Sequence, residues 1–230
     1  TVDRRRYGLD RFRRFDFRLI RQVLGISGFT MLQYFISMST YFIFFIVVER
    51  LGSRDLAVAN IARSLYIVLF IPVSALSTAT NTMVSNLLGA GRVPEVIPLI
   101  RRLTFISVGI TAVFVALLVL FPRLCLSIYT NEAELITAAV PSVVVIALAS
   151  LCSAASSIVF SAISGTGNTR PAFLLEMLAL VAYSVYIYVI VVRLRMPVHL
   201  SFISDIVYYV ALIVGSIVYF RRAAWHQKTI

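Results

Sequence analysis

Six long, mostly apolar runs follow one another along the chain and dominate its pattern. They cover about residues 22–48, 56–88, 96–122, 134–164, 171–192 and 198–220. An α-helix rises ~1.5 Å per residue, so ~20 residues cross a hydrocarbon core of ~30 Å. The runs lack the regular alternation of barrel strands, and strands of an open sheet would leave backbone groups unpaired in lipid. The pattern therefore predicts an all-α integral membrane protein, a six-transmembrane-helix bundle covering residues 21–222.

The predicted connections are short and turn-like. They fall at residues 51–53, 89–91, 165–168 and 196–197, and no second soluble domain is visible between them. Pro72 and Pro141 lie inside apolar runs. Each removes a backbone donor and crowds the preceding turn, so we expect a kink in both helices.

Composition agrees with lipid as the main solvent. Sixty percent of the 230 residues are hydrophobic and 13% are charged, whereas soluble domains average ~45–50% apolar and ~25% charged residues. The formal net charge of +11 would point to nucleic acid in a soluble protein. Residues 1–20, however, interleave arginines with aromatics next to an apolar run, which is typical of a basic helix at a membrane surface. We expect the bilayer, and no nucleic acid, as the partner of this segment.

The arginines also predict an orientation. Six spans place both ends of the chain on one side, and that side carries most of the 21 Lys and Arg residues. The positive-inside rule then places residues 1–20 and the tail at residues 223–230 in the cytoplasm. We expect the protein to lie in the plasma membrane or inner membrane of the cell. The bias rests heavily on the first 20 residues.

Two glycine turns share the pattern S-x-x-x-G-x-G. The first ends in Gly89 and Gly91, the second in Gly165 and Gly167, and each closes an even-numbered run. We expect the first glycine of each pair to adopt the left-handed conformation that ends a helix. A nucleotide-binding P-loop would need a following Lys-Ser/Thr pair, which neither turn has.

These turns carry a resemblance to a known family. Residues 75–92 (ALSTATNTMVSNLLGAGR) and 160–172 (FSAISGTGNTRPA) resemble the multidrug and toxic compound extrusion (MATE) transporters in order and separation. The resemblance implies helices seven to twelve of that family, one lobe of a two-lobe transporter. It also implies an antiporter that exports organic cations or amphipaths, driven by inward proton or sodium flow. The chain opens on Thr1 with no initiator methionine or signal peptide, so we expect it to be part of a longer polypeptide with a missing N-terminal six-helix lobe.

Polar residues at membrane depth are the candidates for a substrate or ion pathway. Many sodium-coupled members carry acids in the seventh and tenth helices, and this chain has neither. Instead the first run offers Gln33 and Tyr34, with Ser37 nearby, and the second offers Asn60 and Asn81. An amide facing lipid would lack partners, so we expect these side chains to face a cavity.

The acids inside the runs are Glu176 and Asp205. A charge at the bilayer centre is costly, so such groups face a cavity or a partner. We expect Asp205 to be the carboxylate that matters most for coupling. Arg63 is expected to be an interfacial residue at the head of the second helix, with a role as the partner of an acid as the alternative. Glu176 is expected to lie nearer the cytoplasmic face, where Arg101, Arg102 or Arg170 would hold it ionised.

Three alternatives to an exporter are a flippase, a membrane enzyme and a scaffold. A lipid-linked oligosaccharide flippase of the same superfamily would carry more cations within the membrane than Arg63 alone. A membrane enzyme would need clustered His, Asp or Glu, and the chain has 2 His, His199 and His226, both at the ends of runs. No catalytic residue, metal site or cofactor is therefore expected. A non-transporting membrane scaffold remains an alternative.

Overall fold

The computed structural model of the chain describes residues 17–222. The predicted interfacial segment therefore lies mostly outside the described residues, as does the tail at residues 223–230. The described elements, in chain order, are α1 (Phe17–Glu49), α2 (Ser53–Gly89), η1 (Val93–Glu95), α3 (Val96–Leu120), α4 (Pro122–Ser127), α5 (Ala133–Gly165), α6 (Thr169–Ile187), η2 (Tyr188–Arg193), α7 (Val198–Ser201) and α8 (Ile203–Arg222).

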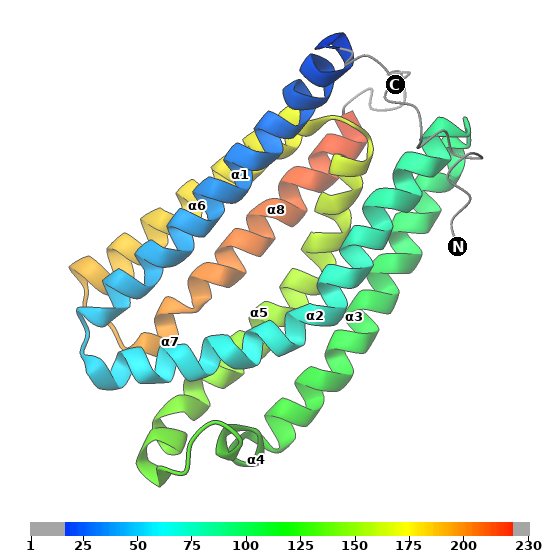
Figure 1. The fold of residues 1–230 in the computed structure, drawn as a ribbon. Coiled ribbons are helices and arrows are strands. Elements are labelled where there is room, and N and C mark those ends of the chain that lie inside the picture. Colours follow the sequence, from blue (N-terminus) through cyan, green and yellow to red (C-terminus); the bar gives the residue numbers. More distant parts are fainter. Residues whose placement is uncertain (1–16, 223–230) are drawn as a thin grey trace, which may run out of the picture.

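Six helical segments of the described chain are long and apolar enough to cross a membrane. The start of α1, the α2–α3 turn, the α5–α6 turn and the end of α8 lie at one end of the bundle (Figure 1). The other connections lie at the opposite end, so successive helices alternate in direction. The protein is an all-α, multi-pass membrane protein.

Several helices are interrupted where the sequence predicted one run. The fifth span ends in a single π-helical stretch, η2, and the sixth begins with the short helix α7 before α8. Pro72 lies inside α2, and Figure 1 shows that α2 bends partway along its length. The segment after α3 also forms a short helix, α4, which begins at Pro122. Proline suits the first position of a helix, because the N–H group that it lacks would have no acceptor within the helix there.

The α5 helix lies in the middle of the bundle, where it contacts α2, α3 and α8. Its buried face is rich in small residues such as Ala147 and Ala154. The hydroxyls of Ser150, Ser153 and Ser156 donate to carbonyls three or four residues earlier in α5. Small side chains of this kind allow helices to pack closely in a membrane.

The glycine turns differ from the prediction in which glycine is left-handed. The positive φ belongs to Gly91 (72°) and Gly167 (75°), the second glycine of each pair. The N–H of Arg92 donates to the carbonyl of Leu87, and that of Gly91 to the carbonyl of Leu88. This is the hydrogen-bond pattern of a Schellman motif. The prediction for Gly89 and Gly165 was wrong because both helices continue through these residues.

Gly165 is required for a different reason. A Cβ at this position would lie 2.7 Å from the backbone carbonyl oxygen of Asn81 in α2. The Ser85 hydroxyl donates to the Gly165 carbonyl at 2.8 Å across the same contact. Gly165 therefore allows the backbones of α2 and α5 to approach closely.

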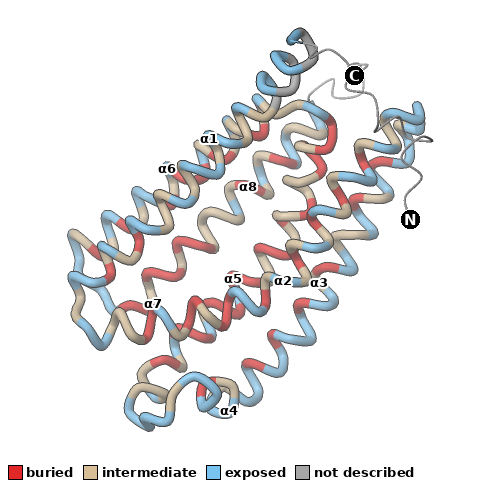
Figure 2. Tube along the Cα trace, in the orientation of Figure 1, coloured by how far each residue is buried: buried red, intermediate tan, exposed pale blue. Residues whose placement is uncertain are grey.

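Side chains outside this core are mostly apolar. Figure 2 shows buried positions along the inward faces, with long exposed stretches on α1 and α3. The exposed side chains on these helices include Met31, Phe35, Phe105 and Val113. A surface of this kind suits contact with lipid.

We expect cysteines introduced at Gly91 and Asn168 to react with a membrane-impermeant thiol reagent from the cytoplasmic side alone. Cysteines at Ser53 and Asn131 should react from the outside alone. The measurement is labelling of intact and inverted vesicles made from cells that express a variant lacking Cys125 and Cys152. Labelling of Gly91 and Ser53 positions from the same side would contradict the six-span arrangement.

Candidate functional site

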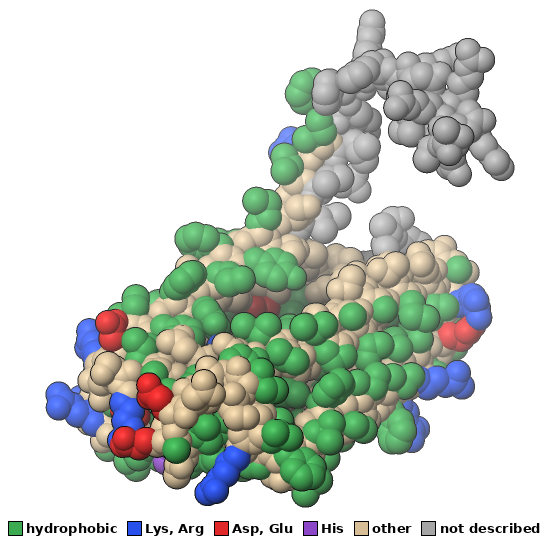
Figure 3. All heavy atoms as spheres, turned by 60° about the horizontal axis from the view of Figure 1, so that its bottom comes forward, with side chains coloured by type: hydrophobic (Ala, Val, Ile, Leu, Met, Phe, Trp, Pro, Cys, Tyr) green, Lys and Arg blue, Asp and Glu red, His purple; other side chains and the backbone are tan. Residues whose placement is uncertain are grey.

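An open cavity of about 510 Å³ lies between α1, α2, α6 and α8. Figure 3 shows an acidic side chain set inside the hollow, with hydrophobic side chains around it. Much of the cavity wall is aromatic. Its tyrosines are Tyr34, Tyr41, Tyr66, Tyr183, Tyr208 and Tyr209.

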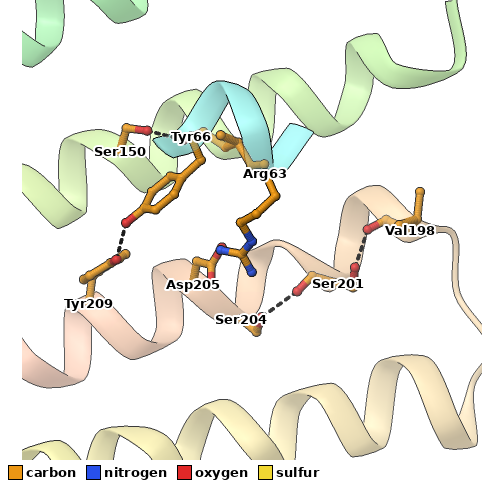
Figure 4. A network of polar contacts seen from close by, with 9 residues as sticks. Arg63, Tyr66, Ser150, Val198, Ser201, Ser204, Asp205 and Tyr209 are labelled. Atoms are coloured by element: carbon orange, nitrogen blue, oxygen red, sulfur yellow. Dashed lines mark hydrogen bonds and ion pairs between the residues drawn. The ribbon is translucent and has the colours of Figure 1, made fainter. Parts of the chain in front are cut away.

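Arg63 of α2 and Asp205 of α8 form an ion pair in the wall of this cavity. The Arg63 Nη1 atom donates to Asp205 Oδ2 at 3.1 Å, and the two residues are 6% and 7% exposed. Figure 4 shows the guanidinium directed at the carboxylate from the neighbouring helix. Arg63 therefore lies in the interior as the partner of Asp205, and not at the interface.

Four aromatic rings surround the Arg63 guanidinium. Its central carbon lies 4.9–5.7 Å from the ring centroids of Phe44, Tyr41, Phe202 and Tyr66, with Phe44 nearest. A desolvated cation over such rings gains about 2 kcal/mol or more of cation–π attraction. This enclosure, together with Asp205, offsets the loss of hydration that burial imposes on the arginine. The Arg63 Nε atom is buried without a hydrogen-bond partner.

Glu176 of α6 occupies a second polar cluster beside the cavity. Gln33 of α1 donates through Nε2 to Glu176 Oε2 at 2.5 Å, and the Ser37 hydroxyl donates to Oε1. The Tyr208 hydroxyl of α8 also lies close to this carboxylate. Glu176 is 6% exposed, so its carboxylate lies in a largely dry setting. The groups that donate hydrogen bonds to it, from Gln33 and Ser37, are neutral.

The expected cationic partners of Glu176 do not reach it. Within residues 17–222 no ion pair joins it to Arg101, Arg102 or Arg170. The Arg170 guanidinium instead lies 5.5 Å from the centroid of the Phe29 ring. The interpretation that nearby arginines hold Glu176 was therefore wrong, because α1 inserts neutral side chains beside it.

The two clusters are joined through tyrosines of α8. Tyr208, which contacts Glu176, packs edge-to-face on Tyr209 with ring centroids 5.1 Å apart. The Tyr209 hydroxyl hydrogen-bonds to that of Tyr66, whose ring lies against Arg63. Both acids thus border one continuous set of aromatic side chains.

The structure separates the remaining predicted pathway residues. Tyr34 lines the cavity and Gln33 bonds to Glu176, as described. Asn60 is exposed on the outer surface of α2, and Asn81 is half-buried where α2 meets α5. Neither asparagine lines the cavity described above.

Sequence reasoning missed the aromatic residues around Arg63. Three of them, Phe44, Phe202 and Tyr66, lie in apolar runs. Aromatic residues are common in such runs, so these residues are not distinguishable there by sequence. The position of Tyr66 was a weak signal, because residues three apart share a helix face and Tyr66 follows Arg63 by three. Phe44 and Phe202 are brought to the site by other helices, so no local pattern marks them.

Comparisons with known proteins agree with this architecture. The family model MatE matches residues 30–200. No curated protein matches the chain significantly. One similar solved structure is a multidrug resistance MATE family transporter of the MOP superfamily in an outward-facing conformation. It has a TM-score of 0.75 and 14% identity over 89% of this chain and 46% of its own.

Another similar structure is a MOP superfamily transporter from Pyrococcus furiosus, in which reverse polarity of the binding pocket suggests a different function. Its TM-score is 0.74 at 14% identity, over 86% of this chain and 44% of its own. The chain thus spans somewhat less than half the length of these two structures. The MatE match covers well over half of the 230 residues, and the chain belongs to the MatE family of membrane transporters.

Proposed function

We propose that this chain is the C-terminal half of an ion-coupled antiporter that exports organic cations or related amphipathic molecules by alternating access. The observation that carries the proposal is the open cavity with buried ionisable groups in its wall and beside it. Ionisable residues at membrane depth mark ion or substrate pathways by default. No cofactor other than a coupling ion, proton or sodium, is part of the proposal.

The chemistry of the cavity supports an amphipathic substrate. Tyrosine and phenylalanine rings offer apolar surface together with faces that attract cations. Met38, Phe70 and Leu180 extend the apolar part of the wall. The charges of Arg63 and Asp205 cancel, so the wall that they share carries no net charge to repel an organic cation.

A second six-helix half is proposed to complete the cavity. On α1, Tyr34, Phe35 and Met38 are 67%, 70% and 61% exposed on or beside the cavity mouth. A homologous lobe that precedes this one in the sequence would cover that side and leave a central cleft. The protein would lie in the plasma membrane or inner membrane of the cell, with both ends of this chain in the cytoplasm.

Export is favoured over two alternatives. A flippase for a lipid-linked oligosaccharide would present free cations to a pyrophosphate group, whereas Arg63 already binds Asp205. A scaffold without transport activity has no use for buried charges beside an open cavity, because a charge in the membrane interior is costly.

The test is transport by the full-length protein in proteoliposomes, with ethidium as the cationic probe. We expect an imposed gradient of protons or sodium to accelerate ethidium movement against the ion flow, and an ionophore that dissipates the gradient to remove the acceleration. The exposed variant Arg54→Gln serves as a control and should behave as the wild type. Absence of any response to either gradient would overturn the proposal.

A further inference from the structure

The two buried carboxylates, Asp205 and Glu176, differ in the charge that is left in the protein interior when each is protonated. Asp205 is bonded to Arg63 within a ring of aromatic side chains. A proton on Asp205 would leave the Arg63 cation alone in the interior, which is strongly unfavourable. Glu176 faces neutral donors, so a proton on Glu176 removes one charge and leaves no other charge unbalanced.

Most other titratable side chains on the surrounding helices, among the described residues, make no hydrogen bond or ion pair with Glu176. These include Tyr34, Tyr41, Cys152, Tyr183, Asp205 and Tyr209. In the described part of the chain, none of these donates to Glu176 or forms an ion pair with it. Tyr208 of α8 is the titratable group that contacts it, and Arg170 on α6 itself lies against Phe29.

Ser37 gives Glu176 satisfied hydrogen bonds in both charge states. Its hydroxyl oxygen lies within bonding distance of Glu176 Oε1 and also 2.9 Å from the backbone carbonyl oxygen of Gln33. An ionised carboxylate accepts hydrogen bonds, whereas a protonated one also donates. When Glu176 is ionised, Ser37 donates to it. When Glu176 is protonated, it donates to Ser37, and the Ser37 hydrogen turns to the Gln33 carbonyl.

The partners of Glu176 also border the cavity. Ser37 and Tyr208 both line it, while Glu176 lies behind them. They come from α1 and α8, and Glu176 from α6, so one proton alters the contacts among three helices. From this geometry we infer that Glu176 takes up and releases the coupling proton. Ser37 and Tyr208 transmit its change of charge to the cavity wall. This inference rests on the ion-coupled transport proposed above.

The experiment compares ethidium transport by the full-length protein in proteoliposomes with and without a pH gradient. The readout is the ratio of the two rates, so changes in ethidium binding do not enter it. We expect Glu176→Gln to lose the response to the gradient while it retains ethidium exchange in the absence of a gradient. The double variant Arg63→Gln/Asp205→Asn should keep a response to the gradient, and Arg54→Gln should match the wild type.

A response of Glu176→Gln equal to that of the wild type would overturn the inference, as would a wild type that responds to sodium alone. A wild type without a response to any ion gradient would instead overturn the proposed function. Infrared spectra of the purified protein between acidic and alkaline pH provide a readout that needs no transport. A protonated-carboxyl band that titrates should be lost in Glu176→Gln and kept in the double variant. Its persistence in Glu176→Gln would exclude Glu176 as its source.

Discussion

Replacement of Arg63 by glutamine, with Asp205 retained, is expected to destabilise the folded bundle by about 3–5 kcal/mol. The change leaves the Asp205 carboxylate buried without its cation, and it removes the contacts between the guanidinium and the four aromatic rings. The measurement is the free energy of unfolding in mixed micelles titrated with a denaturing detergent.

The matched controls use a second variant and a second ion pair. Arg63→Gln/Asp205→Asn removes both charges and should recover part of the lost stability, since neither partner is left charged. Arg54 and Glu134 form a pair of 2.8 Å between exposed side chains. Arg54→Gln should therefore change the free energy of unfolding by about 1 kcal/mol at most. Equal losses for Arg54→Gln and Arg63→Gln would show that the buried pair has no special contribution.

Gly165→Ala is expected to destabilise the bundle by about 1–3 kcal/mol, the usual range for an added carbon in a tightly packed interior. The new Cβ would lie 2.7 Å from the Asn81 carbonyl oxygen and 3.1 Å from Val84 Cβ. The first is a backbone atom and the second is attached directly to the backbone, so neither can turn aside and α2 and α5 must move apart. The loss of stability is measured by thermal unfolding of the purified protein.

Gly109→Ala supplies the control for this prediction. Gly109 lies within α3, and a Cβ there meets no other atom within 4 Å. This substitution should leave stability unchanged or raise it slightly, because alanine favours helix more than glycine does. If both variants unfold at the same temperature, the contact between α2 and α5 is looser than its geometry implies.

Several features of the fold were predictable because they depend on local sequence alone. The length of each apolar run against the thickness of a bilayer predicted six spanning helices, and short glycine-containing segments predicted the turns between them. The resemblance carried by residues 75–92 and 160–172 predicted the family, which the MatE match confirmed. Which glycine is left-handed was not predictable, because it depends on where the last helical hydrogen bond forms.

The candidate site was only partly predictable. Glu176, Asp205 and Gln33 stood out because polar groups are costly within lipid. Their partners did not. The Arg63–Asp205 pair joins residues 142 apart in the sequence, and the Gln33–Glu176 bond joins residues 143 apart. From the sequence alone, Asp205 was the favoured coupling carboxylate, because its ion pair with Arg63 could not be foreseen. In the structure, the neutral surroundings of Glu176 favour Glu176 as the coupling carboxylate.

The sequence by itself determined that the chain crosses a membrane, how many times it does so, and which residues carry charge within the membrane. Only the tertiary structure decided which of those residues meet. The physical reason is that lipid is as apolar as the interior of the bundle, so an apolar helix face does not reveal whether it turns inward. The rotation of each helix is decided by its packing against its neighbours, as where α5 approaches α2 closely at Gly165 and Asn81. That rotation places Arg63 against Asp205 and leaves Glu176 among neutral donors.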